Sequence, residues 1–211
     1  SRENSIFSFI MSFLINPYIY NAFVPIDFSG LNLTRIWAMF KTSEATVNYG
    51  LEIARDLSGV DIKVVFYDSN GEISGNSPTG ADTSTPSATD TLQDFIDLFP
   101  ASTIRVTKIY CQITGLVLAE GGTTAPRIYD GSTLNLTNGK LDMVFRDAAS
   151  GFLFTNTVLP EMDSGDDFSV SAVANVDATS TSATPVIAGN KTSLTNNNGG
   201  HTLFIDRDTT K

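Results

Sequence analysis

The feature that most constrains the fold is a two-residue alternation of apolar and other side chains that recurs along the chain. Residues 34–42, 46–54, 61–68 and 168–176 each show it over eight or nine positions. A β-strand points successive side chains to opposite faces of a sheet, so this period predicts strands rather than helices. The same segments contain many β-branched and aromatic residues, which favour strands.

The clearest turn signal is the dipeptide Asn138–Gly139, which lies between alternating segments at 133–137 and 140–145. Asn-Gly is the preferred pair for a type I′ turn because both residues adopt a positive φ easily. The sequence therefore predicts a β-hairpin here. A long loop is predicted at 74–89, where Ser, Thr, Pro and Gly dominate.

One helix is predicted, between residues 90 and 99. Asp90 is the expected N-cap, and Gln93 follows three residues later as in a variant of the capping box. The apolar residues recur at helical spacing: Leu92, Phe95, Ile96 and Phe99. We expect this stripe to face a core and Pro100 to end the helix.

Residues 103–119 predict one long strand or a bent pair of strands. Ile104 and Val106 share one phase of the alternation, whereas Ile109 and Cys111 share the other. This change of phase near Lys108 predicts a β-bulge, which would bend the strand. Cys111 lies in the apolar phase, so we expect it to be a small buried hydrophobic residue without a reactive thiolate.

These signals add up to roughly nine or ten strands with a single helix. Because strands do not alternate with helices, a parallel α/β sheet is excluded. We predict an all-β chain: a jelly-roll-like antiparallel β-sandwich with long loops, one short inserted helix and an apolar N-terminal arm. The arm is predicted at 1–26 and the single sandwich domain at 27–211. An immunoglobulin-like sandwich or a barrel would explain the same signals, but the length favours the jelly roll.

The arm prediction depends on residues 5–26, which contain no charged side chain. Asn16 and Pro17 interrupt the apolar run too early for a membrane-spanning helix, and no small-residue cleavage site marks a secretory signal. The remaining readings are an interaction arm and a first core element of the domain. The side chains that would make the contact are Phe7, Phe9, Phe13, Leu14, Tyr18 and Tyr20.

The charge pattern argues against direct contact with nucleic acid. The chain carries 13 basic and 23 acidic residues, for a net charge of −10, and its basic residues are scattered singly. Phosphate binding needs clustered Lys and Arg. Only 17% of the residues are charged, whereas Ser, Thr and Asn make up 61 of 211. We therefore expect a surface covered mainly by hydroxyl and amide groups.

The sequence offers little for catalysis. A Ser-His-Asp or Cys-His site would have to use His201, the only histidine, which follows an Asn- and Gly-rich loop. Neither a nucleophile elbow nor a phosphate-binding loop is present. Cys111 and His201 together cannot supply the four ligands of a structural zinc site. We therefore expect no enzymatic activity and no resident cofactor.

Calcium is the one ligand that the sequence suggests. Asp163, Asp166 and Asp167 crowd carboxylates into one loop, and hard cations bind such oxygen clusters. A solvated acidic turn is the alternative, since Asp and Gly are ordinary turn residues. A second group, at 68–72, invites the same two readings. Glycosylation sequons occur at Asn32, Asn135 and Asn190, as often happens in a chain rich in Asn and Thr.

A non-enzymatic β-sandwich with an apolar arm and a neutral surface is typical of assembly subunits. We therefore expect a viral structural protein, a capsid or shell subunit located in the virion. Its partners would be copies of itself, other shell proteins and, through the arm, a lipid membrane. The alternative is a secreted or cell-surface binding module, such as an adhesin, a pilus subunit or a carbohydrate-binding domain.

Overall fold

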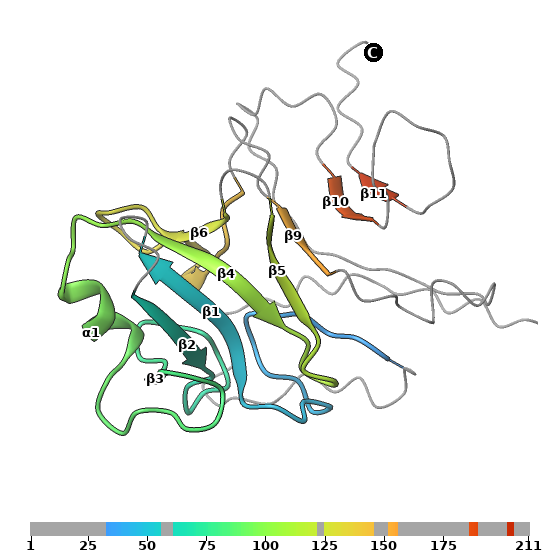
Figure 1. Ribbon diagram of the computed structural model, residues 1–211, viewed down its shortest axis with the longest axis horizontal. Coiled ribbons are helices and arrows are strands. Elements are labelled where there is room, and N and C mark those ends of the chain that lie inside the picture. Colours follow the sequence, from blue (N-terminus) through green and yellow to red (C-terminus); the bar gives the residue numbers. More distant parts are fainter. Residues whose placement is uncertain are drawn as a thin grey trace, which may run out of the picture.

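The computed structural model describes residues 33–55, 61–121, 125–145, 152–155, 186–189 and 202–204 (Figure 1). This part of the chain is built mostly from antiparallel strands with one short helix, which confirms the all-β prediction. The predicted arm, the predicted strand at 168–176 and the domain boundary at 26 lie outside the described residues.

Within the described ranges, seven strands form the main sheet. They are β1 (Tyr49–Arg55), β2 (Ile62–Phe66), β3 (Thr79–Gly80), β4 (Ile104–Tyr110), β5 (Val117–Gly121), β6 (Arg127–Tyr129) and β9 (Phe152–Phe154). Two separate pairs are β7 (Leu136–Thr137) with β8 (Lys140–Leu141), and β10 (Val186–Gly189) with β11 (Thr202–Phe204). The helix α1 (Leu92–Asp97) lies between β3 and β4 in the chain.

The strand order of the main sheet contains a Greek key. The order is β3-β2-β1-β4-β5-β9, and every neighbouring pair is antiparallel. Three successive strands, β1 to β3, are neighbours, and β4 returns through the long connection that includes α1 to pair with β1. This is the 4-1-2-3 order that defines the motif. The other edge of β4 is shared, because β6 pairs with its first residues and β5 with its last.

The predicted bulge is present in β4. Glu52 of β1 pairs with Lys108, but the next residue, Ile53, pairs with Val106. Thr107 is therefore the extra residue, and its hydroxyl donates to the backbone oxygen of Glu52 at 3.2 Å. The bulge explains the change of phase seen in the sequence. After β4 the chain turns at 111–116 and continues as β5, so a pair of strands is found rather than one long strand.

One face of the sheet carries the main core. Its buried residues come from β1, β2, β4, β6, β8, α1 and the segment after β2. They are Leu51, Ile53, Val65, Tyr67, Ile73, Leu92, Phe95, Ile96, Ile104, Val106, Ile109, Ile128, Tyr129 and Leu141. Burying one such aliphatic side chain contributes about 1.5–3 kcal/mol, so this cluster dominates the stability of the described fold.

The opposite face of the sheet is also partly apolar and buried. Ala54, Val64 and Phe66 point to it and are at most 3% exposed. Part of the cover comes from the loop after β3, because Thr85 O lies 2.6 Å from the position that a Cβ on Gly80 would take. Only glycine allows the backbone to approach so closely there.

The helix begins one residue later than predicted. Thr91, not Asp90, is the N-cap: its hydroxyl accepts from Asp94 N–H, and the Asp94 carboxylate accepts from Thr91 N–H at 2.9 Å. The reciprocal pair therefore uses Asp94 as the third residue, whereas Gln93 donates to Asp97 at 2.8 Å instead. Phe99, predicted to lie on the buried stripe, is beyond the helix end and 58% exposed.

The structure also differs from the sequence prediction at residues 36–46, which we call the strap. The alternation at 34–42 predicted a strand, but the strap makes only isolated bridges and lies across the core face, where Trp37 and Met39 pack against the cluster. Its backbone bonds go to a turn, with Lys41 N–H donating to Gly71 O at 2.6 Å and Ile73 N–H to Met39 O at 2.8 Å. Tertiary packing, not pairing with a long strand, holds this segment extended.

Gln112, which is fully buried, connects the strap to the turn after β4. Its Oε1 accepts from the N–H of Thr42 at 2.9 Å and from the Thr42 hydroxyl at 3.0 Å, and its Nε2 donates to Phe40 O at 2.6 Å. The Gln112 backbone donates to Ile36 O and accepts from Thr46 N–H, both at 2.8 Å. The side chain and the backbone of Gln112 together therefore hold the strap through several hydrogen bonds.

Candidate functional site

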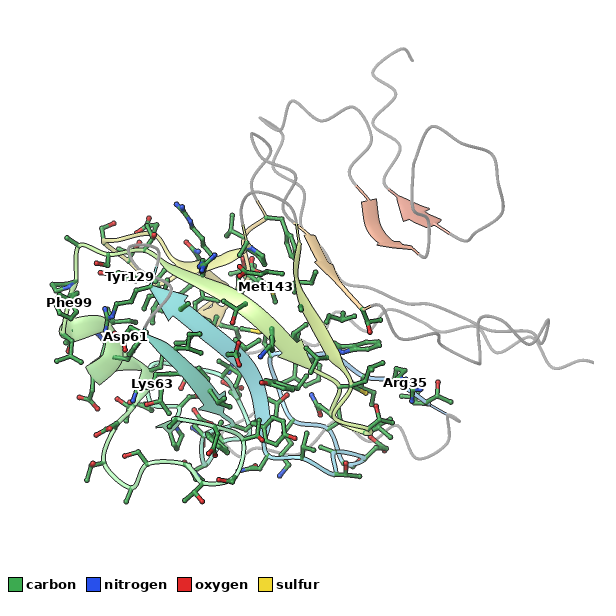
Figure 2. All side chains as sticks on the ribbon, in the orientation of Figure 1. Arg35, Asp61, Lys63, Phe99, Tyr129 and Met143 are labelled. Carbon is green, nitrogen blue, oxygen red and sulfur yellow. The ribbon has the colours of Figure 1, made fainter. Side chains whose placement is uncertain are left out.

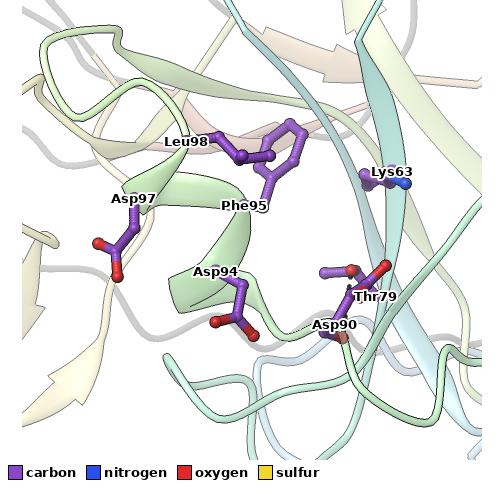
Figure 3. A pocket seen from close by; sticks show the side chains of 7 residues that line it. All are labelled: Lys63, Thr79, Asp90, Asp94, Phe95, Asp97 and Leu98. Carbon is purple, nitrogen blue, oxygen red and sulfur yellow. Dashed lines mark hydrogen bonds between the residues drawn. The ribbon is translucent and has the colours of Figure 1, made fainter.

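A pocket of about 410 Å³ lies between α1 and the edge of the main sheet at β2 and β3 (Figure 3). Its lining combines carboxylates, one ammonium group and apolar side chains. The lining residues are Lys63, Thr79, Asp90, Asp94, Phe95, Asp97 and Leu98. We take this pocket as the candidate binding surface of the described chain, because concave sites that mix apolar walls with a few polar groups are where proteins bind partners.

The carboxylates come from α1 and the residue just before its cap. Asp94 and Asp97 are three residues apart on the helix, so they lie on one face. Hydrogen bonds from the Thr91 hydroxyl and backbone hold the pKa of Asp94 below its usual value, so that side chain is ionised at neutral pH. Asp90 accepts from the Thr89 hydroxyl at 3.0 Å. This wall of the pocket is therefore negatively charged.

The rest of the pocket lining carries no carboxylate. Lys63 points from β2, and within the part of the chain that the structure describes its ammonium group makes no hydrogen bond or ion pair. Leu98, 68% exposed, stands at the pocket with Phe95 beneath it. Figure 3 shows Lys63 on the strand and Asp94 and Asp97 on the helix. The surface can contact a group that is cationic at one end and apolar along its length.

Arg55 fixes α1 to the sheet beside this pocket. Its guanidinium, 5% exposed, donates to Asp61 at 2.7 Å and to Phe95 O. The group also lies over two aromatic rings, 4.0 Å from the centroid of Phe95 and 4.9 Å from that of Phe99. Asp61, Lys63 and Phe99 gather at this end of the sheet (Figure 2). The position of the pocket wall therefore depends on Arg55.

A second polar cluster lies on the opposite face of the sheet. The Glu52 carboxylate accepts from the Thr107 hydroxyl at 2.8 Å, from Lys108 Nζ at 2.8 Å and from the Tyr110 hydroxyl at 3.4 Å. Burial and the nearby Glu52 charge raise the pKa of Tyr110. Tyr110 also packs edge-on against Tyr49, with ring centroids 4.9 Å apart. Every polar group of this cluster has a partner, so it stabilises the bulge of β4 rather than leaving a free reactive group.

Most side chains singled out in the sequence lie outside the described residues. This holds for the candidate calcium ligands Asp163, Asp166 and Asp167, and for His201. It also holds for the aromatic and aliphatic residues of the arm: Phe7, Phe9, Phe13, Leu14, Tyr18 and Tyr20. The calcium and arm hypotheses therefore stay predictions.

Cys111 is described, and it is fully buried as predicted. Burial opposes ionisation, but hydrogen bonds from Thr114 and from neighbouring backbone N–H groups together place the thiol pKa below its usual value.

The acidic turn at 68–72 uses its carboxylates within the protein. Asp68 accepts from the N–H groups of Asn70 and Glu72 and from the Ser74 hydroxyl. Glu72 pairs with Lys140 of β8 at 2.5 Å. These carboxylates form a turn and an ion pair, and within the described ranges no group of three or more His, Cys, Asp or Glu side chains is placed to hold a metal ion.

One glycosylation sequon is described. Asn135 donates from its side-chain amide to Arg127 O at 3.0 Å, and its backbone N–H donates to Ile128 O. The amide nitrogen that would carry a glycan is therefore engaged in holding the hairpin β7–β8 to β6. Among the residues that the structure describes, no helix is both long and apolar enough to cross a membrane.

The pocket is not among the features predicted above, although the sequence carries a signal for it. Asp90, Asp94 and Asp97 recur at helical spacing around the apolar stripe of α1, which predicts an acidic face beside a core face. The sequence alone does not indicate which residues form the opposite wall of the pocket. Lys63 and Thr79 reach the pocket only because β2 and β3 pair at the edge next to α1.

Thr91→Ala is expected to lower the free energy of unfolding by about 1 kcal/mol, because it removes the N-cap of α1. Thr89→Ala is the matched control: this hydroxyl contacts only loop groups and is exposed, so its loss is expected to change stability by at most about 0.5 kcal/mol. Urea denaturation monitored by circular dichroism measures both. Equal effects of the two variants would mean that the capping box does not stabilise α1.

No family model matches the chain, and no similar protein was found among curated proteins or among solved structures.

Proposed function

We propose that the chain is a structural subunit of a viral shell, built on a jelly-roll-like β-sandwich and devoid of enzymatic activity. In this proposal the subunit assembles in the virion with copies of itself and with other shell proteins. Residues 1–26 form the arm that makes the assembly contact, and a lipid layer beneath the shell is the second surface that the arm meets. Nucleic acid is not contacted directly.

Two features of the sheet support the sandwich. The order β3-β2-β1-β4 is a Greek key, which most β-sandwiches contain. The sheet also buries apolar side chains on both faces, such as Ile53 on one and Val64 on the other. A sheet does this when it lies between two layers of structure.

The observation that carries the assembly proposal is the anchoring of the strap. The strap follows the uncharged segment 5–26 closely in the chain, and Gln112 binds it to the sheet through side-chain and backbone hydrogen bonds. If the arm binds a neighbouring subunit, that contact also restrains the domain, because the strap that follows the arm in the chain is hydrogen-bonded to the sheet. A loosely tethered leader would not need this attachment.

The arm is tested by replacing Phe7, Phe9 and Phe13 together with serine. Fully burying one such ring contributes about 1.5–3 kcal/mol, so their loss is expected to abolish assembly. The domain should remain folded, with unchanged circular dichroism and cooperative unfolding. Light scattering coupled to size-exclusion chromatography measures the particle mass.

The matched control replaces three serines of the same segment, Ser5, Ser8 and Ser12, with alanine, and it should assemble as the unaltered protein does. Normal assembly of the phenylalanine variant would overturn the proposal. Loss of cooperative unfolding would instead show that the segment is a core element of the domain. Co-flotation of the unaltered protein with lipid vesicles, lost in the phenylalanine variant, tests the lipid contact.

A binding module is the second candidate, and the pocket beside α1 favours it. Leu98 lines the pocket beside its carboxylates and is more than half exposed, as at a recognition surface. If the chain is such a module, Leu98→Ser should abolish binding to its target while leaving light-scattering mass unchanged. A shell subunit would show the opposite dependence, on the arm rather than on Leu98.

A further inference from the structure

Three Asn-Gly dipeptides occur in the chain, at Asn70, Asn138 and Asn198. Glycine offers no side chain to shield its backbone nitrogen, so that nitrogen can attack the side-chain carbonyl of the preceding asparagine. Whether it does so in a folded protein depends on how firmly the local backbone is held. The structure describes the first two dipeptides, and it places them in very different surroundings.

Asn138–Gly139 forms the exposed tip of the hairpin β7–β8. Asn138 has a φ of 52° and Gly139 a φ of 77°, the left-handed pair of a type I′ turn. The turn is closed by the pairing of Thr137 with Lys140. Neither the Asn138 side-chain amide nor the Gly139 N–H has a hydrogen-bond partner within the described ranges. A Cβ placed on Gly139 would meet nothing within 4 Å.

Asn70–Gly71 has the same two residues but a fixed backbone. Gly71 N–H donates to Asp68 O at 2.9 Å, and Asn70 N–H donates to the Asp68 carboxylate at 2.8 Å. The Gly71 carbonyl accepts from Lys41 N–H of the strap at 2.6 Å. The nitrogen that would attack is thus already bonded, and the turn cannot rotate without releasing the strap.

We propose that Asn138 is a site of spontaneous deamidation and isomerisation in the folded protein, and that Asn70 is protected. In the reaction the Gly139 backbone nitrogen loses its proton to solvent base and forms a bond to Cγ of Asn138. The bond from Cγ to the side-chain nitrogen breaks, and ammonia leaves with a proton from solvent. Water then opens the resulting succinimide ring at either carbonyl, which gives aspartate or isoaspartate. No oxidant or reductant takes part.

The modification would alter the hairpin. Isoaspartate lengthens the backbone by one methylene group inside a two-residue turn, and either product adds a negative charge. The nearby hydrogen bond from Thr137 to Asp142, at 2.7 Å, and the ion pair of Lys140 with Glu72 depend on the register of this turn. Conversion is therefore expected to weaken the attachment of β8 to the rest of the domain.

The experiment incubates the purified full chain in mildly alkaline buffer and follows each dipeptide by peptide mapping with mass spectrometry. Because the hydrogen bonds of Asn70–Gly71 must break before attack, conversion at Asn138 is expected to be roughly tenfold faster or more than at Asn70. Mapping by peptide also separates both sites from Asn198. Gly139→Ala should slow conversion at Asn138 and leave Asn70 unchanged.

The unfolded chain in concentrated urea is the matched control. There the two dipeptides lose their different surroundings and should convert at similar rates. Equal rates at Asn70 and Asn138 in the folded protein would overturn the proposal. So would an Asn138 that stays intact in the folded protein over a period in which the urea-unfolded chain converts.

Discussion

Replacing Gln112 with alanine is expected to lower the free energy of unfolding by about 3 kcal/mol or more, because several buried groups lose their partners at once. Phe40 O loses a donor, and both the N–H and the hydroxyl of Thr42 lose their acceptor. Each buried polar group left unsatisfied costs about 1–3 kcal/mol, and the removed side chain also leaves a cavity. Urea denaturation measures the change.

The strap should loosen before the sheet unfolds in this variant. Trp37, the only tryptophan of the chain, lies on the strap and donates to Leu116 O at 3.4 Å, so its fluorescence reports on the contact between the strap and the sheet. A red shift of its emission is expected at urea concentrations where the circular dichroism of the sheet is still intact. Gln93→Ala is the matched control, since this exposed amide donates a hydrogen bond to exposed Asp97 and its loss should change stability by at most about 0.5 kcal/mol.

Two results would contradict this account of Gln112. One is a loss of stability no larger than that of the Gln93 variant. The other is a Gln112→Glu variant as stable as the unaltered protein, because glutamate cannot donate to Phe40 O and would bury a charge.

Arg55→Ala is expected to destabilise the protein by about 2–4 kcal/mol. The guanidinium contacts two aromatic rings, and each such cation–π contact contributes about 0.5–2 kcal/mol. Its removal also leaves Phe95 O without its donor and a void beneath α1. Since Arg55 fixes α1 to the sheet, we expect the helical signal of α1 in this variant to be lost at a lower urea concentration than the signal of the sheet.

The ion pair with Asp61 should contribute little to this effect. Asp61 is 40% exposed, and exposed carboxylates are well solvated, so Asp61→Asn is expected to cost at most about 1 kcal/mol. Arg55→Met keeps an apolar stem and removes a charged group whose Nη1 has no hydrogen-bond partner among the described residues, so it should be less harmful than alanine. A loss in Asp61→Asn as large as in Arg55→Ala would show that the charge pair, rather than packing, holds α1.

Local patterns in the sequence were sufficient wherever a short stretch of chain decides its own structure. The hairpin at Asn138–Gly139 is confirmed because only residues that tolerate a positive φ make a type I′ turn. The bulge near Lys108 and the burial of Cys111 are confirmed because alternation records which side of a sheet each residue faces. The all-β class follows from the same two-residue period.

Contacts between distant segments decided the rest. Residues 34–42 alternate as a strand does, yet most of them belong to the strap, because Gln112, some seventy positions away, supplies hydrogen bonds that a neighbouring strand would have supplied. The helix starts at Thr91 because its hydroxyl and the Asp94 carboxylate satisfy each other. The Greek-key order, and the pocket between α1 and Lys63, depend on which strand edges pair, and alternation marks the faces of a strand but not its partners.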